Sequence, residues 1–314
     1  MIYKKHGHIL LKSLSLIAVL PNVCNTQTTA VKTVKSPLYH SDNKTNLNMQ
    51  ENGLSPLQLA IAAKNLELVE FLLENKANPN YVAPNGTTPL TTALKLDSAD
   101  QQIQLSIINA LIKAGVNINR QDAHGNTALM YAVRHNNLIL TQFLIASEAT
   151  NLNLQNIHGD TALIYAARHN NHPALAEVLI NAGALLNIQK KNGDTALIMA
   201  AKNNNLATVQ ALIKAGANLN LQEKRGCTAL IRAAINNNFA IVKALIKAKA
   251  NVNIQNNNGD TVLIWAAISN NPKMVKALIK AGANVDHKDD EGNTAFDSTT
   301  DATTKTILKA ATQA

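Results

Sequence analysis

Apolar positions in residues 191–223 follow two helical patterns separated by polar residues. The first is the run ALIMAA at 196–201, and three asparagines follow it at 203–205. The second places apolar residues at helical spacing: Leu206, Val209, Leu212 and Ile213. It ends at Gly216, where a glycine can supply the left-handed conformation that closes many helices. We therefore predict two short antiparallel helices followed by a projecting turn.

The same pattern recurs along the chain. Its turn glycine belongs to a series spaced by 33, 39, 34, 34, 33, 33 and 33 residues: Gly53, Gly86, Gly125, Gly159, Gly193, Gly226, Gly259 and Gly292. Self-similarity at this period predicts a stack of repeated units. The copies are residues 51–83, 84–122, 123–156, 157–190, 191–223, 224–256 and 257–289, with a partial capping copy at 290–314.

Each copy also contains residues that begin or end helices. A serine or threonine, the preferred N-cap types, stands two positions after each glycine, and Pro56 and Pro89 then occupy the first helical position in two copies. The asparagine runs fit the end of the first helix because asparagine tolerates left-handed backbone. The second copy is six residues longer than the 33-residue norm, with the excess expected between its helices around residues 96–104. A binding role and tolerated length variation both remain open for that excess.

The N-terminal segment has the layout of a secretory signal peptide. Lys4 and Lys5 precede the apolar run at residues 9–20, and a polar stretch follows it. We expect a signal peptide at 1–30; a disordered or amphipathic tail and a lipid anchor at Cys24 are the alternatives. Residues 31–50 are expected to be a polar linker ending in a partial N-terminal cap, because TNLNMQ at 45–50 mirrors TNLNLQ at 150–155.

Composition gives the net charge and limits which residues can form the core. The 314 residues carry a formal net charge of +9, and aromatic residues make up only 3%, so alanine, leucine and isoleucine must supply the core. Positive charge favours an acidic partner surface, or weak attraction to nucleic acid or membranes. The two cysteines, Cys24 and Cys227, indicate no disulfide framework. Cys227 fills a slot that is asparagine or aspartate in other copies, so we expect it on the surface.

These motifs resemble the ankyrin repeat, whose signature runs from a turn glycine through T-P-L-H-x-A-A to L-L-x-x-G-A-x-x-N. SPLQLA at 55–60 and LIKAGANLN at 212–220 carry the likeness, which covers roughly residues 45–314. The resemblance implies an all-α ankyrin-repeat solenoid of helix-turn-helix units with projecting β-turn or hairpin loops, acting as a non-enzymatic protein-binding scaffold. The family's histidine is replaced by other residues, which predicts greater reliance on apolar packing: Gln58, Thr91, Met130, Ile164, Ile198, Ile231 and Ile264.

The resemblance also implies a partner-binding strip on the concave side, formed by the turn tips and the first helices. Carried over position by position, it assigns these residues: Arg134, His135, Arg168, His169 and Lys202 on helices, and His124, His158, Lys191, Lys224 and Arg225 at tips. Residues three apart on a helix share a face, which adds Tyr131, Tyr165, Arg232 and Trp265. Aromatic residues and arginine often anchor interfaces. Packing between copies is the alternative role of this column. The basic strip suggests an acidic or phosphorylated partner, and surface basicity without a partner is the alternative.

Other chemistry is not indicated. Equivalent histidines in adjacent copies, such as His124 and His158, should lie about 8–10 Å apart, too far to share a zinc ion without further ligands. A repeated surface lines up similar residues, whereas a catalytic centre needs unlike residues converging on one pocket. We expect neither an enzyme nor a cofactor.

The leading hypothesis is a monomeric protein-binding scaffold, secreted or periplasmic, with no membrane span in the mature chain. Ankyrin-rich chains with signal-like N-termini resemble exported effectors of host-associated bacteria. Nucleic-acid or acidic-surface binding through the basic strip is an alternative, although no recognition motif supports it. A structural or self-associating role is the third hypothesis, and a cytoplasmic location is the alternative to export.

Overall fold

The computed structural model describes residues 53–96, 100–168 and 173–313. These form two compact units that divide between Ile118 and Asn119. The expected signal peptide, the polar linker and the predicted site residue His169 lie outside the described residues. Regular structure in the described part of the chain is helical, apart from a single bridge residue at Leu54, which confirms the predicted all-α stack of helix pairs.

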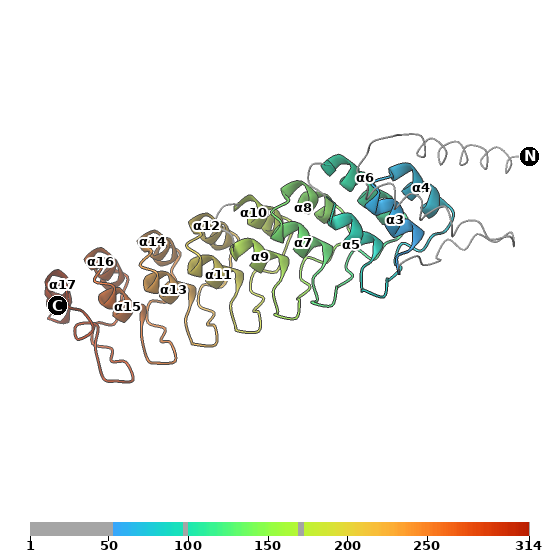
Figure 1. Cartoon of the computed structure of the whole chain (residues 1–314). Coiled ribbons are helices and arrows are strands. Elements are labelled where there is room, and N and C mark those ends of the chain that lie inside the picture. The colour runs from blue at the N-terminus through green and yellow to red at the C-terminus, as the bar shows by residue number, and fades with distance from the viewer. Residues whose placement is uncertain (1–52, 97–99, 169–172, 314) are drawn as a thin grey trace, which may run out of the picture. The chain divides into compact units, whose positions relative to one another are not determined.

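In the first unit, α3 (Pro56–Ala62) packs against α4 (Leu66–Glu74), and α5 (Pro89–Leu94) packs against α6 (Gln101–Lys113). The second unit contains five further pairs and a final helix: α7 (Ala128–Arg134), α8 (Leu138–Ile145), α9 (Ala162–Arg168), α10 (Pro173–Asn181), α11 (Ala196–Lys202), α12 (Leu206–Lys214), α13 (Ala229–Ile235), α14 (Phe239–Lys247), α15 (Val262–Ile268), α16 (Pro272–Lys280) and α17 (Ala302–Thr312). Figure 1 shows these elements along the chain.

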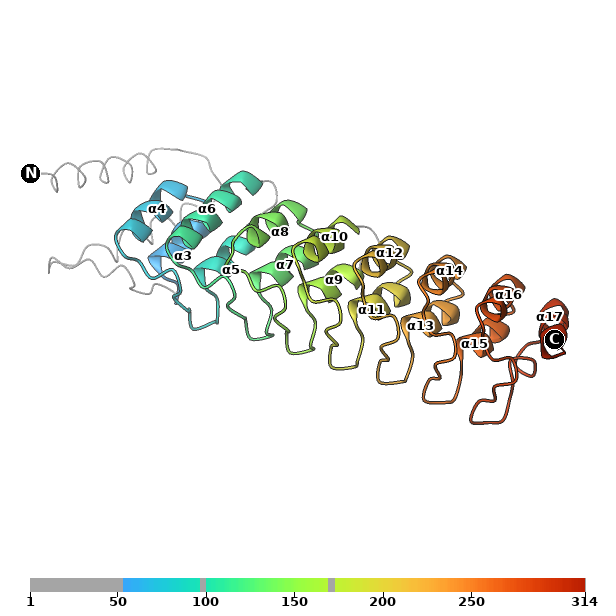
Figure 2. The ribbon, with the colours of Figure 1, turned by 180° about the vertical axis from the view of Figure 1, so that it is seen from behind.

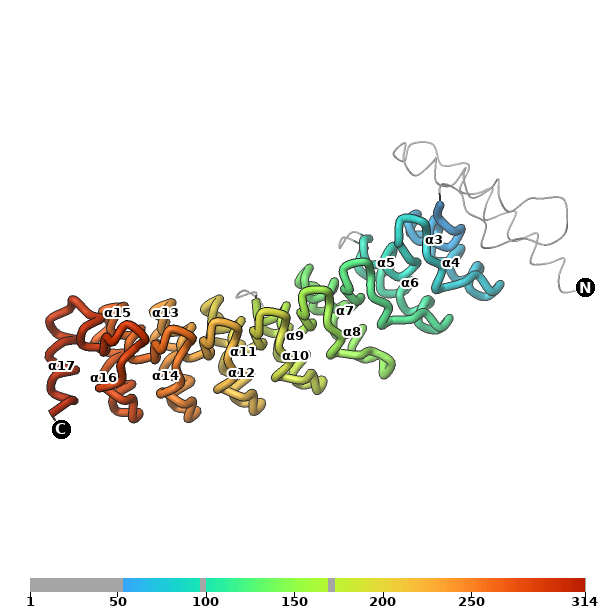
Figure 3. The backbone as a smooth tube through the Cα atoms, turned by 90° about the horizontal axis from the view of Figure 1, so that it is seen from below, coloured from blue at the N-terminus to red at the C-terminus, as the bar shows by residue number. Residues whose placement is uncertain are grey.

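Within the second unit the helices form two rows (Figure 3). The first helices of the copies, α7, α9, α11, α13 and α15, stand side by side, and the second helices, α8, α10, α12, α14 and α16, form a parallel row against them. The turns project from the side of the first helices that faces away from the second helices (Figures 1 and 2). This arrangement leaves the turn tips and the second helices on opposite sides of the unit.

Side-chain caps set where the helices begin. Ser55 Oγ accepts the N–H of Gln58 at 3.3 Å, while Gln58 Oε1 accepts the N–H of Ser55 at 3.1 Å. This reciprocal pair is a capping box, worth on the order of 1 kcal/mol for the N-cap alone. Thr127, Thr161, Thr195 and Thr228 each cap a first helix by accepting the N–H three residues on, without the reciprocal bond.

The asparagine runs perform two tasks. The second-to-last asparagine of each run adopts left-handed backbone, with φ of +55° at Asn136 and +57° at Asn204, as predicted. The next one caps the second helix: Asn137 Oδ1 accepts the N–H of Leu140 at 2.9 Å, and Asn205 does the same for Thr208. One pair of residues therefore ends one helix and begins the next.

The first helices are buried between their neighbours, and the second helices bury one stripe each. Residues 196–201 of α11 are all buried, whereas in α12 burial is confined to Thr208, Val209 and Leu212. The isoleucines that replace the family's histidine, such as Ile198 and Ile231, are each 1% exposed. Burying such a side chain contributes roughly 1.5–3 kcal/mol, so the predicted reliance on apolar packing is confirmed.

Two expectations were wrong in part. Cys227 is buried, with 3% of its surface exposed, because its slot lies beneath the turn; Asp160 and Asp194, which fill the same slot in other copies, are buried too. The excess of the second copy does not form a loop alone, because α6 begins at Gln101 and takes in its last four residues. Residues 97–99 lie outside the described part of the chain.

The C-terminal partial copy forms a cap. Its threonine-rich start makes a turn at residues 295–298 instead of a first helix, and α17 then packs on α16. Thr304 and Leu308 are the buried residues of α17. Asp301 caps it by accepting the N–H of Thr304 at 2.7 Å. The last copy thus lays one mostly polar helix over the apolar face that the stack would otherwise expose.

Candidate partner-binding surface

The turn tips of the second unit are joined to one another by backbone hydrogen bonds. Each tip donates one N–H to a carbonyl of the preceding tip at 2.9–3.1 Å: Ile157 to His124, Lys191 to His158, Lys224 to Asn192, Asn257 to Arg225 and Asp290 to Asn258. We call this series, residues 122–126, 156–160, 190–194, 223–227, 256–260 and 289–293, the tip row. The bonds hold successive tips in close register.

Glycine permits this close approach. Gly193 has φ of +85°, and a Cβ there would lie 2.8 Å from Cα of Glu223 and 2.9 Å from the amide nitrogen of Lys224. Gly159 would place its Cβ 2.7 Å from the nitrogen of Lys191. Both the backbone conformation and the space exclude larger residues.

Glutamine side chains reinforce the tip row. Gln189 Nε2 donates to the carbonyl of Gly193 within its own turn at 2.8 Å and to the carbonyl of Gln222 in the next copy at 2.9 Å. Gln121, Gln155 and Gln222 make the same two bonds in their own copies. We call these side chains the glutamine ladder. The tips are therefore a hydrogen-bonded surface and not a set of independent loops.

The predicted aromatic column lies mostly inside the stack. Tyr165 is 7% exposed, and its hydroxyl contacts Asn156 Nδ2 at 2.9 Å. Tyr131 is half-buried and donates to Asp122 Oδ2 at 2.6 Å, while its ring stacks on His135 at 6.3 Å. Trp265 is partly buried, and its indole N–H has no hydrogen-bond partner among the described residues. Tyr165 is therefore enclosed by the stack, whereas Tyr131 and Trp265 keep part of their surface exposed.

Several cations of the strip are held by buried carboxylates. Arg168 Nη2 and Lys190 Nζ lie 3.3 and 3.2 Å from Asp160 Oδ1. The other pairs are Lys202 with Asp194 at 2.6 Å and Arg232 with Glu223 at 2.5 Å. Sequence reasoning missed these acids as partners. Their signal was a carboxylate eight or nine positions before the cation in successive copies.

Hydrogen bonding at these sites shifts the titration of the acids. Burial alone would raise the pKa of Glu223, but hydrogen bonds from the N–H of Arg225 and from Arg232 outweigh it and lower that pKa. The pKa of Asp122 is likewise lowered, because bonds from Tyr131 and the turn amides outweigh burial. Burial, with the bond to Asp122, raises the pKa of Tyr131 to about 12. At neutral pH both acids are charged acceptors and Tyr131 is a neutral donor.

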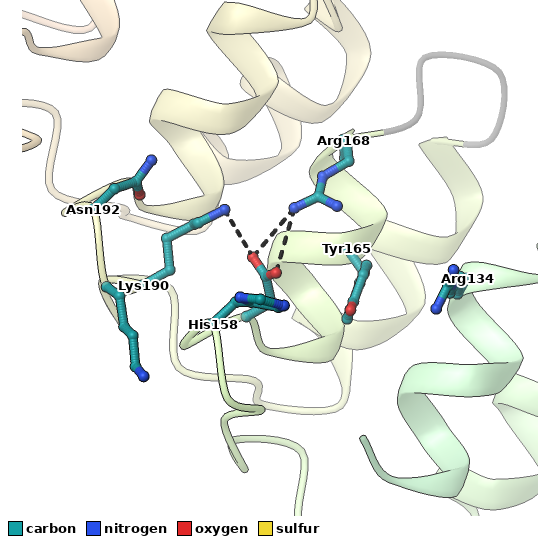
Figure 4. Close-up of a pocket in the computed structure, with 8 residues that line it drawn as sticks. Arg134, His158, Tyr165, Arg168, Lys190 and Asn192 are labelled. Atoms are coloured by element: carbon teal, nitrogen blue, oxygen red, sulfur yellow. Dashed lines mark hydrogen bonds and ion pairs between the residues drawn. The ribbon is translucent and has the colours of Figure 1, made fainter. Parts of the chain in front are cut away.

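Exposed cations remain beside these pairs and line a pocket of about 690 Å³ formed by the third, fourth and fifth copies (Figure 4). Its lining is Arg134, His158, Asp160, Tyr165, Arg168, Lys190, Lys191 and Asn192, which we call the anion pocket. Asp160 is its single carboxylate and already faces Arg168 and Lys190. No ion pair to Arg134 or Lys191 occurs within the described ranges, and both are exposed. The pocket therefore has uncompensated positive charge.

The other predicted tip residues are exposed. His124, Lys224 and Arg225 stand on the tip row, and none is brought into the anion pocket. In the part of the chain that the structure describes, no group of three histidine, cysteine or acidic side chains could hold a metal ion. No helix in that part is both long and apolar enough to cross a membrane.

Comparison with known proteins identifies the class. A family model described as ankyrin repeats, in sets of three copies, matches residues 22–122, 97–190, 167–256 and 240–310. Because these matches cover most of the sequence, the chain belongs to the ankyrin repeat family. Ankyrin repeats generally serve as protein–protein interaction modules and are typically non-catalytic.

Individual relatives match over shorter segments. The chain is 30% identical over 102 residues to human transient receptor potential cation channel subfamily A member 1, covering 32% of this chain and 9% of the channel. Two ankyrin repeat proteins of fowlpox virus are 35% and 33% identical over 91 and 79 residues, covering 29% and 25% of this chain and 14% and 39% of the viral proteins. The matched segment spans well under half of each relative.

Among solved structures, the ankyrin repeat domain of Bcl-3, a member of the IkappaB protein family, is similar with a TM-score of 0.60 and 24% identity. The match covers 82% of this chain and 100% of that domain. At this identity the likeness supports the fold alone.

Proposed function

We propose that the chain is a protein-interaction scaffold that binds an acidic or phosphorylated segment of a partner along the tip row. The observation that carries this proposal is the anion pocket, where four cationic side chains surround a single carboxylate. That carboxylate is 2% exposed and already paired, so it cannot neutralise Arg134 or Lys191. A partner carboxylate or phosphate would supply the missing charge.

The side chains suit such a ligand. Arg134 presents a guanidinium whose planar fork can bind carboxylate or phosphate through two hydrogen bonds. Lys191 adds a second charge from the neighbouring tip, and His158 adds a ring donor or acceptor between them. Arg168 and Lys190 both point to Asp160, which holds them in the lining of the anion pocket (Figure 4).

The tip row also lowers the entropic cost of binding. Its turns are fixed by backbone bonds and by the glutamine ladder before any partner arrives. A preorganised surface loses less conformational freedom on association, so more of the interaction energy appears as affinity. This favours recognition by surface complementarity with little rearrangement.

A peptide library tests the proposal directly. Peptides with acidic or phosphorylated side chains, and matched neutral peptides, are assayed for binding to the full chain. An Arg134→Gln/Lys191→Gln variant should lose affinity for the charged peptides by about tenfold or more, since charge-assisted hydrogen bonds contribute roughly 1.5–3 kcal/mol each. Lys273→Gln/Lys276→Gln removes the same charge from α16 and is the matched control. Equal losses in the two variants, or no preference for charged peptides, would refute the proposed site.

Export and solution state belong to the same proposal. The basic start and apolar run at residues 9–20 support export, and the repeat composition supports a role as an effector acting on a host protein. N-terminal sequencing of the protein from cell fractions tests export, since an intact N-terminus found only in the cytoplasm would contradict it. Light scattering at increasing protein concentration tests whether the chain is monomeric, and an increase in the apparent mass would favour self-association.

A further inference from the structure

The second helices near the C-terminus carry a dense set of lysines that the proposed function does not use. The residues are Lys214 on α12, Lys243 and Lys247 on α14, Lys249 just after it, and Lys273, Lys276 and Lys280 on α16, and all seven are exposed. We call them the lysine face. None forms an ion pair within the described ranges, although Lys243 Nζ lies 5.7 Å from the centre of the Phe239 ring.

Few acids occur along the segment that contains α12, α14 and α16. Between residues 195 and 285 the only acidic residues are Glu223 and Asp260, and both are buried at 6% and 9% exposure. Glu223 is already paired with Arg232, and Asp260 accepts a hydrogen bond from Asn256. The second helix of the first copy is the opposite case, because α4 carries Glu67, Glu70 and Glu74 and no lysine. The positive charge is therefore concentrated on particular helices.

The lysines form a two-dimensional array. Lys243 and Lys247 are four residues apart, and Lys273, Lys276 and Lys280 follow spacings of three and four, so each set occupies one side of its helix. The helices α12, α14 and α16 contact one another in sequence, and packed helices lie about 8–10 Å apart. The second helices that carry the array lie on the opposite side of the first helices from the turns (Figure 2).

We propose that the lysine face docks on an anionic lipid surface. Its members are lysines, which act as point charges on flexible stems, and it contains no arginine fork for reading bases or phosphates bidentately. It also lacks a row of exposed aromatic rings on which nucleic-acid bases could stack. An array extending over three helices matches a layer of headgroups, and basic residues close to such a layer gain electrostatic attraction individually. Docking this side leaves the tip row free for a protein partner.

Vesicle sedimentation with the full chain tests the proposal. The probes are phosphatidylcholine vesicles with and without phosphatidylserine, at low and high salt. Binding should require phosphatidylserine and should fall as salt screens the charges. Vesicles of phosphatidylcholine alone measure any contribution from the apolar run at residues 9–20. The triple variant Lys243→Gln/Lys247→Gln/Lys276→Gln should bind roughly a hundredfold more weakly, at about fivefold per lysine.

A matched variant separates this face from net charge. Lys191→Gln/Lys224→Gln/Arg225→Gln removes three charges from the tip row and should retain most vesicle binding. Circular dichroism of both variants checks that each is folded. Equal loss in the two variants would overturn the proposal, because it would mean that total charge and not the lysine face determines binding. Binding of duplex DNA without binding of vesicles would also overturn it and would point to nucleic acid.

Discussion

Two glycines allow two contributions to stability to be measured separately: the conformational strain of left-handed backbone, and the close approach of neighbouring turns. Gly193 has φ of +85° and Gly216 has φ of +84°. A Cβ at Gly193 would meet two backbone atoms of the next copy at 2.8 and 2.9 Å, whereas nothing lies within 4 Å of a Cβ at Gly216. Alanine at each position therefore imposes the same conformational penalty, but only Gly193→Ala forces neighbouring turns apart.

The expected magnitudes differ accordingly. Left-handed backbone costs a non-glycine residue about 1–2 kcal/mol, part of which is offset because alanine restricts the unfolded chain. Gly216→Ala should therefore destabilise by about 1 kcal/mol. Gly193→Ala should destabilise by roughly 1–3 kcal/mol more than Gly216→Ala, the usual cost of overpacking a close contact. It should also weaken the hydrogen bond from the N–H of Lys224 to the carbonyl of Asn192.

Urea denaturation followed by circular dichroism measures the difference. Both the midpoint and the slope of the unfolding transition are compared between the variants, because a stack of repeats can lose cooperativity when one interface weakens. Hydrogen exchange at the tips of residues 190–194 and 223–227 should accelerate in Gly193→Ala and stay unchanged in Gly216→Ala. If the two variants lose the same stability to within about 0.5 kcal/mol, the close approach of the turns contributes nothing and the reasoning about the tip row fails.

Three further outcomes are expected. Lys249 has φ of +67° at a position where several other copies have glycine, including Gly183, Gly216 and Gly282. Lys249→Gly should therefore raise the free energy of unfolding by about 0.5–1 kcal/mol in urea titration; a loss of stability would contradict the assigned strain. Because the pKa of Glu223 is lowered on folding, the unfolded carboxyl takes up its proton first as pH falls. The stability it contributes is thus full above its ordinary pKa of 4.5 and is lost as pH falls below that value. Thermal melts should show Glu223→Gln less stable than the native chain at neutral pH, with the gap closing in acid, and a gap independent of pH would argue against the Arg232 pair. Burial protects Cys227 and raises the pKa of its thiol. In a Cys24→Ser background, a thiol reagent should therefore react with the folded chain at least about tenfold more slowly than with the chain in denaturant. Equal rates would show that the site opens freely.

Local features could be predicted from the sequence because they depend on neighbours along the chain. Thr195 as an N-cap, Asn204 in left-handed backbone and the burial of Ile198 follow from residue type and spacing, and the structure confirms all three. The cap formed by Asn205 was missed because the run was interpreted only as a helix end. That neighbouring asparagines end one helix and cap the next becomes evident once both helix boundaries are known.

The candidate site was less predictable because it depends on contacts across turns. Tyr165 and Arg232 occupy the expected column, but Tyr165 is buried and Arg232 is paired with Glu223, and spacing within one helix predicts neither. Cys227 was expected on the surface because its slot is polar elsewhere, yet Asp160 shows that a polar side chain there is buried and paired. Net charge likewise gave no indication that six lysines lie on three neighbouring second helices, with a seventh just after α14.

The glutamine ladder has a consequence for how such a chain changes over evolutionary time. Gln155, Gln189 and Gln222 connect consecutive copies through the same donor and the same acceptor. Unequal recombination that adds or deletes one whole copy therefore recreates an identical junction, and no compensating substitution is needed. Loss of part of a copy would leave a glutamine opposite the wrong backbone atom. The gene can change the length of its product in units of one repeat while single copies diverge at their tips to fit new partners.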